Sequence, residues 1–153
     1  MTNQDFATGY YHWFFLIQPD GLPEHMIGLD PEYYLTEKLD RWSDSRFSFK
    51  PEVIAEYSRY FRDPAAIHAS CEDYRAAATI DLQHDRESFE QMVTQPLLAL
   101  WGKYGFIERQ FEVLDCWREK AINVEGFSLN CGHFLAEEKP RALSTALLKF
   151  LNK

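Results

Sequence analysis

The segment QPLLALWG, residues 95–102, restricts the fold most, because its apolar side chains follow one another without the alternation typical of a half-exposed strand. Such a run, ended here by a glycine, is typical of a strand buried on both faces of a parallel sheet. An amphipathic helix is predicted next over residues 106–121, then a second short strand in VEGFSLNCGH, residues 124–133. With a closing helix over residues 141–151, the order is a βαβα unit, and the sequence therefore predicts the α/β class.

Residues before about 92 have a different character and are predicted to be helical. Three segments begin as helices do, with a proline at the first position: DPEYYLTEKLDRW, KPEVIAEYSRYF and DPAAIHASCEDYRAAATIDL. Asp30 and Asp63 are the expected N-caps of the first and third. An apolar stripe predicts an earlier helix from Phe6 to Ile17, which QPDGLPEH then breaks. The chain is thus expected to be helix-dominated, with helices over 1–92 and an α/β part over 93–153.

Composition excludes several partners. The 153 residues amount to about one domain. The net charge is −8 and the pI about 5.1, which argues against nucleic acid or an anionic membrane as a partner, since both need clustered Lys and Arg. The N-terminus has no basic region, and the apolar run Trp13–Ile17 is too short for a signal peptide or membrane span. We therefore expect a cytoplasmic protein, in which the three cysteines, Cys71, Cys116 and Cys131, are reduced.

Cofactor and metal motifs are not found in the sequence. It contains no P-loop, no dinucleotide-binding glycine pattern and no G-x-S-x-G elbow. His68, Cys71 and Glu72 are predicted on one helical face, but no fourth ligand has a suitable spacing. The sequence thus predicts neither a cofactor nor a metal ion.

Two histidines are candidates for chemistry. His133, in NCGHFLAEEKP, follows the carboxyl end of a predicted strand, the edge at which open α/β sheets bind ligands. Glu137 and Glu138 suit the first turn of the following helix. His12 and Trp13 lie side by side in the aromatic segment GYYHWFF near the start of the chain. From the residues alone, an exposed loop histidine remains the favoured interpretation of His133, and core packing that of the His12–Trp13 pair.

Four blocks, in order and spacing, resemble the α/β-hydrolase haloacetate dehalogenases, fluoroacetate dehalogenase among them. They are YYHWFFLIQP…PEH, DPAAIHASCEDYRAAATID, PLLALWG and CGHFLAEEKP, and they span nearly the whole chain. The resemblance is to the C-terminal half of such an enzyme. It implies that residues 1–92 form the helical cap and residues 93–153 the last two core strands with their helices.

The resemblance also implies roles for four residues. His12, Trp13 and Tyr74 match the cap side chains that donate hydrogen bonds to the departing halide. His133 matches the general base that activates water to hydrolyse an aspartyl-ester intermediate. The implied reaction converts a small haloacid to a hydroxy acid and halide without a cofactor.

The chain departs from the family in what it lacks. The family's nucleophilic Asp in a GHDRG-like elbow, its substrate-binding arginines and its oxyanion loop have no match here. A truncated reading frame, half of a split gene and a designed fragment all agree with this. The expected partner is a missing N-terminal half or a second copy of the chain. An epoxide hydrolase, disfavoured by the His12–Trp13 pair, and an inactive fragment acting only as an interaction module remain the alternative functions.

Overall fold

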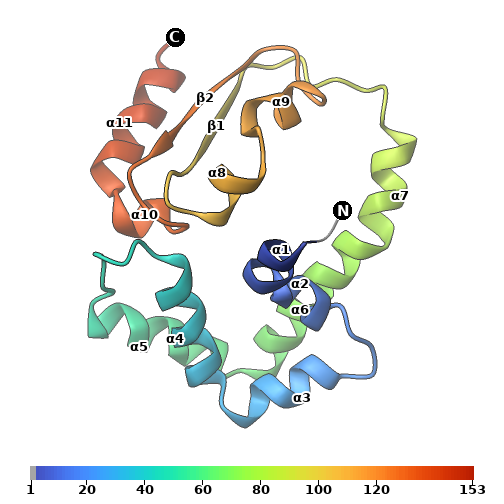
Figure 1. Cartoon of the computed structure of the whole chain (residues 1–153), viewed down its shortest axis with the longest axis vertical. Coiled ribbons are helices and arrows are strands. Elements are labelled where there is room, and N and C mark those ends of the chain that lie inside the picture. Colours follow the sequence, from blue (N-terminus) through green and yellow to red (C-terminus); the bar gives the residue numbers. More distant parts are fainter. Residues whose placement is uncertain (1–2) are drawn as a thin grey trace. The chain divides into compact units, whose positions relative to one another are not determined.

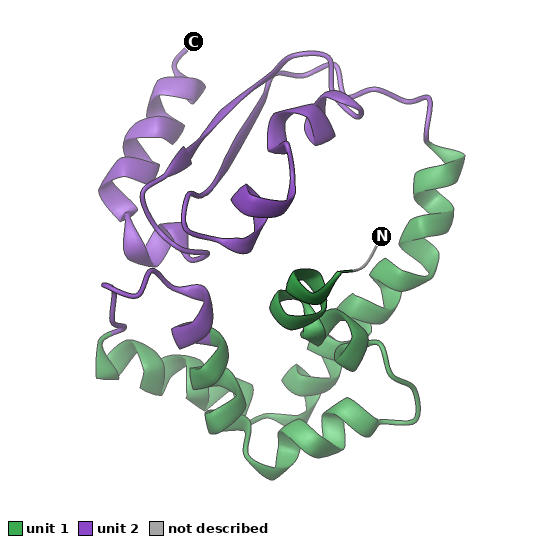
Figure 2. Ribbon diagram, viewed as in Figure 1, with its two compact units in different colours: residues 1–38, 50–88 green, residues 39–49, 89–153 purple. Residues whose placement is uncertain are grey.

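The computed structural model describes residues 3–153, which fold into two compact units (Figure 2). The first unit comprises the residues up to Lys38 together with Lys50–Ser88, and the second comprises Leu39–Phe49 and Phe89–Lys153. Leu39–Phe49 thus folds with the residues that follow Ser88. The functional division into residues 1–92 and 93–153 stays a prediction.

The first unit is helical, as the sequence predicts (Figure 1). Its helices are α1 Gln4–Gly9, α2 Tyr11–Leu16, α3 Leu22–Leu29, the first part of α4 Pro31–Trp42, α5 Pro51–Phe61, α6 Pro64–Ala78 and α7 Ile80–Glu87. Both predicted aspartate caps are confirmed. Asp30 accepts from the backbone N–H of Tyr33 at 3.0 Å, and Asp63 accepts from that of Ala65 at 2.9 Å.

Two helices predicted in this unit are each divided in the structure. The helix expected from Phe6 to Ile17 is interrupted at Tyr10, after Gly9, a residue that weakens helices. The helix beginning at Pro64 ends at Thr79, whose backbone leaves the helical region and whose hydroxyl bonds the carbonyl of Arg75 at 2.6 Å. QPDGLPEH does not only break a helix. A left-handed Asp20–Gly21 turn within it leads directly into α3.

A small core holds the helices of the first unit together. Its buried members are Leu16, Ile27, Ile67 and Cys71, and Phe15, Tyr34, Phe61 and Tyr74 pack around them. Cys71 is fully buried here, whereas His68 and Glu72 on the same helix are exposed. The core joins α2, α3 and α6, and thereby fixes the faces of α2 and α6 relative to each other.

The second unit is the α/β part. β1 Leu97–Gly102 and β2 Val124–Leu129 pair in parallel, with Leu97 opposite Val124, and form the two-stranded sheet of the described residues. α8 Phe106–Gln110 and α9 Val113–Arg118 lie between the strands in sequence, and α10 Leu135–Glu138 and α11 Pro140–Leu151 follow β2. The predicted strand–helix–strand–helix order and the α/β fold class are confirmed.

The single helix expected over residues 106–121 is instead two helices. Phe111 has an extended backbone, with φ −135° and ψ 141°, and ends α8. The break allows α8 to contact β1 while α9 contacts both strands. Glu108 in α8 accepts a hydrogen bond from the Trp101 indole of β1, which fastens the first helix to the strand.

Much apolar surface of the second unit remains open to solvent. Leu97, Leu98 and Leu100 of β1 are only half-buried, although the run reads as an interior strand. No residue of α11 is buried, and Leu148 and Leu151 are 60% and 74% exposed. In residues 3–153, no helix combines the length and apolar character needed to cross a membrane.

Candidate functional site

The structure brings together the three side chains predicted to bind halide. His12 and Trp13 lie on α2 and Tyr74 on α6, all in the first unit. The Tyr74 ring centroid is 5.6 Å from that of His12 and 4.9 Å from that of Trp13, both in edge-to-face contact. The His12 and Trp13 centroids are 6.5 Å apart. Three side chains that carry N–H or O–H donors therefore belong to one aromatic cluster.

Burial within this cluster is uneven. His12 is 2% exposed, Trp13 is 37% exposed, and Tyr74 is half-buried. Desolvation raises the pKa of the Tyr74 hydroxyl, and the neighbouring Asp73 carboxylate adds to this effect. Tyr74 therefore stays protonated at neutral pH and remains a hydrogen-bond donor.

Arg75, next in sequence to Tyr74, ties α6 to the ends of two other helices. Its Nε and Nη2 atoms donate to the carbonyl of Gln18, just after α2, at 3.1 and 2.6 Å. Nη1 and Nη2 donate to the two carboxylate oxygens of Glu24 in α3 at 2.6 and 3.0 Å. These bonds lower the pKa of Glu24 to about 2, so the carboxylate stays ionised. The arginine thus fixes Tyr74 against the helix that carries His12 and Trp13.

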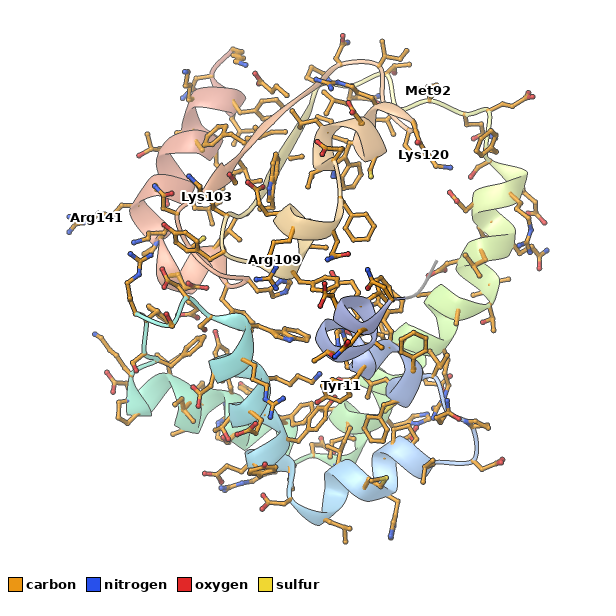
Figure 3. All side chains as sticks on the ribbon, in the orientation of Figure 1. Tyr11, Met92, Lys103, Arg109, Lys120 and Arg141 are labelled. Atoms are coloured by element: carbon orange, nitrogen blue, oxygen red, sulfur yellow. The ribbon has the colours of Figure 1, made fainter. Side chains whose placement is uncertain are left out.

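A cation lies close to the same helix. Tyr11, labelled in Figure 3, is the first residue of α2. Lys38 is buried, and its Nζ is 4.2 Å from the ring centroid of Tyr11. This contact was not predicted from the sequence, because Lys38 lies in a helix that reads as polar.

The side chains of Glu24, His68 and Glu72 lie close enough together to hold a metal ion. Arg75 already pairs with both carboxylates, so the group is an ion-pair network.

His133 belongs to the second unit and follows β2, as predicted. Its backbone N–H donates to the carbonyl of Trp42 at 2.7 Å. Its ring is in edge-to-face contact with the rings of Trp42 and Phe134, at centroid distances of 5.1 and 5.2 Å. Desolvation lowers the pKa of the imidazole below its usual 6.5, and the negative charge of Glu138 opposes this only in part. The ring packs against Trp42 and Phe134 on one side and keeps access to solvent on another, and the lowered pKa leaves it neutral at pH 7, the state a general base requires.

Glu138 is the residue of this region that sequence analysis missed. It was read as a first-turn acid, but its buried carboxylate accepts the backbone N–H groups of Gly132, Phe134 and Asp44. Gly132 is required here, since an added Cβ would lie 2.4 Å from the carbonyl oxygen of Trp42. The sequence signal is an acid five residues beyond a histidine, in a loop whose N–H groups need acceptors.

A cavity of about 400 Å³ lies beside this loop, and none of the predicted site residues lines it. The guanidinium of Arg46, in the cavity wall, forms a bidentate ion pair with Asp44. Its Nε donates to Oδ1 at 3.0 Å and its Nη2 to Oδ2 at 2.6 Å. The cavity is lined by Asp44, Arg46, Phe47, Tyr104, Asn130, Glu138 and Lys139.

Comparison with known proteins places this arrangement among α/β hydrolases. The chain is 38% identical over 147 residues to a fluoroacetate dehalogenase of Burkholderia sp, covering 95% of this chain and 48% of that protein. It is 36% identical over 128 residues to a soluble epoxide hydrolase of Corynebacterium sp. strain C12, covering 82% of this chain and 43% of that protein. No protein-family model matches the chain.

The fold similarity is equally extensive. A crystal structure assigned to the α/β hydrolases, from Nostoc sp PCC 7120, superposes with a TM-score of 0.94 at 56% identity, over 99% of this chain and 52% of that one. The chain spans about half the length of the curated relatives it matches. These relatives confirm the resemblance inferred from the four sequence blocks.

Proposed function

This chain belongs to the α/β-hydrolase superfamily, and we propose that it supplies the halide-binding residues and the general base of a haloacid dehalogenase. The observation that carries the proposal is the contact of His12, Trp13 and Tyr74 in one aromatic cluster. A carboxylate that displaces halide from carbon builds negative charge on the halogen. Neutral imidazole, indole and phenol donors stabilise that charge in a desolvated site without adding a charge of their own.

His133 serves the second half of the reaction. The displacement leaves an ester between the carboxylate and the acid product. A water molecule then loses a proton to the neutral imidazole and attacks the ester carbonyl, which releases the hydroxy acid and regenerates the carboxylate. The lowered pKa of His133 keeps this step available below pH 6.5, and the step is lost only as the pH falls through that lowered value.

The nucleophile of this reaction is proposed to come from a second polypeptide segment. The chain contains no GHDRG-like elbow, and about half of each curated relative has no counterpart in it. The partner we propose carries that other half, with the carboxylate nucleophile and the groups that bind the substrate carboxylate. A small haloacid is then the substrate, and no cofactor is needed.

Epoxide hydrolysis is the second candidate. A relative of this class is 36% identical to the chain, and Tyr74 packs on the same core as Tyr34, so phenol donors for an epoxide oxygen are close together. The His12–Trp13 pair favours the haloacid, because an imidazole and an indole donate to an anion but cannot replace a phenol as proton donor to an alkoxide.

Substitution of the halide donors tests this assignment. In the chain combined with its complementary half, His12→Ala and Trp13→Phe are each expected to lower turnover about 10²-fold, as loss of one oxyanion donor does. The loss is expected to be larger for fluoroacetate than for chloroacetate, because fluoride is the harder and more strongly hydrogen-bonded ion. Phe14→Leu, on the same helix but without a donor, is the matched control. Unchanged fluoroacetate turnover in both donor variants would refute the halide assignment.

A further inference from the structure

We propose that Glu138 is a positioning residue for His133, holding the backbone on both sides of the histidine and fastening it to the segment that follows α4. The proposal rests on the proposed function only in taking His133 as the general base. Glu138 itself touches neither substrate nor water in this role. It acts through the loop that carries the imidazole.

Three consecutive backbone N–H groups, those of residues 132–134, each donate to an identified acceptor. Glu138 Oε2 accepts from Gly132 N at 2.7 Å, and Oε1 accepts from Phe134 N at 3.0 Å. Between them, His133 N donates to the carbonyl oxygen of Trp42 at 2.7 Å. A single carboxylate thus brackets the histidine, and the histidine's own N–H is held from the opposite side.

The same carboxylate binds a segment far away in sequence. Glu138 Oε2 also accepts from Asp44 N at 3.0 Å, across 94 positions. Trp42, two residues earlier, contacts the His133 ring at 5.1 Å between centroids. Residues 42–44 therefore contact the loop at its main chain and at the His133 ring, and Glu138 is bonded both to this segment and to the loop.

Burial makes this arrangement specific to a carboxylate. Glu138 is only 9% exposed, and a buried charge is tolerated when hydrogen bonds replace its water. Three N–H donors fill acceptor positions on both oxygens, as charge-assisted bonds. A glutamine retains one acceptor oxygen but directs an NH₂ group at the N–H of Phe134 or at those of Gly132 and Asp44. At least one donor–acceptor pair is then replaced by two facing donors.

Nitrogen-15 NMR of the chain alone tests the proposal without substrate. In Glu138→Gln, exchange of the Gly132, Phe134 and Asp44 amides is expected to quicken about tenfold or more, the usual cost of a hydrogen bond to a charged group. The pKa of the His133 imidazole is expected to fall further below 6.5, because the opposing negative charge of Glu138 is lost. Glu137→Gln removes the same charge one residue away and is expected to change neither measurement.

Further variants separate positioning from stability alone. Glu138→Asp keeps the charge and is expected to restore much of the His133 pKa, with intermediate amide protection. In the complemented protein, Glu138→Gln is expected to lower kcat about 10²-fold with little change in KM, as a displaced catalytic group does. If Glu138→Gln unfolds, exchange in the unaltered chain decides, since these amides must then be well protected.

The proposal would be overturned if Glu138→Gln left the amide exchange rates and the His133 pKa as they are in the unaltered chain. Unprotected Gly132 and Phe134 amides in the unaltered chain would overturn it as well. Failure of the complemented protein to release halide would contradict the proposed function and leave the NMR result intact, so the two outcomes are distinguishable.

Discussion

Fluoride is expected to appear from fluoroacetate when this chain is joined to the half of an α/β hydrolase that it does not match, and not from the chain alone. The chain offers donors for the halide in His12, Trp13 and Tyr74 and a base in His133, but its sequence contains no nucleophile elbow. Donors and a base without an attacking carboxylate leave the carbon–fluorine bond intact. Because enzymes accelerate reactions by at least about 10⁶-fold, the contrast between the two samples should be large.

The unmatched half of the Burkholderia fluoroacetate dehalogenase is a suitable complement, since the chain is 38% identical to that protein. It is supplied by co-expression or by fusion, and a fluoride electrode follows product. The complement alone is the control for activity that does not need this chain. Halide release by this chain alone, above background and lost in His133→Ala, would contradict the expectation.

Self-association of the isolated chain at micromolar concentration is the second large effect that we expect. Leu97, Leu98 and Leu100 are half-buried in a strand whose apolar sequence is typical of full burial, and β1 pairs with β2 alone among residues 3–153. The unpaired N–H and C=O groups of a strand edge can form hydrogen bonds with a strand of another chain. Leu148 and Leu151 of α11 add exposed apolar area.

The energy available is comparable with the stability of a whole domain. Covering ~400 Å² of apolar surface contributes about 10 kcal/mol gross at ~25 cal/mol per Å², while a domain is stable by about 5–15 kcal/mol. Light scattering should therefore report a dimer or larger species, and a hydrophobic dye should bind. The complemented protein is the control, because its sheet is completed. A monomer of 18.0 kDa with a cooperative melt and no dye binding would show that this surface is covered in another way.

Features coded by neighbouring residues were predictable from the sequence. The Asp–Pro pairs at Asp30 and Asp63 mark helix starts, because an aspartate caps the helix and the proline after it has the backbone angle of a first turn. The apolar run of β1 and the alternation of elements after it gave the α/β class. The contact of His12 and Trp13 with Tyr74 followed from the family resemblance rather than from any local pattern.

Features that depend on distant contacts were not predictable. Periodicity joined α1 to α2 and α8 to α9, because apolar spacing continues across Tyr10 and Phe111 while tertiary contacts turn the chain there. The role of Glu138 requires knowing that Asp44 and Gly132 share its carboxylate. A single sequence carries no signal of that meeting, which explains why Glu138 reads as an ordinary first-turn acid.

Fluoride release by the complemented protein carrying His133→Ala shows whether this chain supplies both the halide site and the base of a dehalogenase. The halide donors remain in this variant while the base that hydrolyses the ester is lost. We predict a burst of about one fluoride per complemented molecule, followed by no turnover, with the ester detectable as added mass on the complementary half. Continuous fluoride release at the unaltered rate would contradict this assignment. So would the absence of a burst when the complementary half is unaltered and folds with this chain.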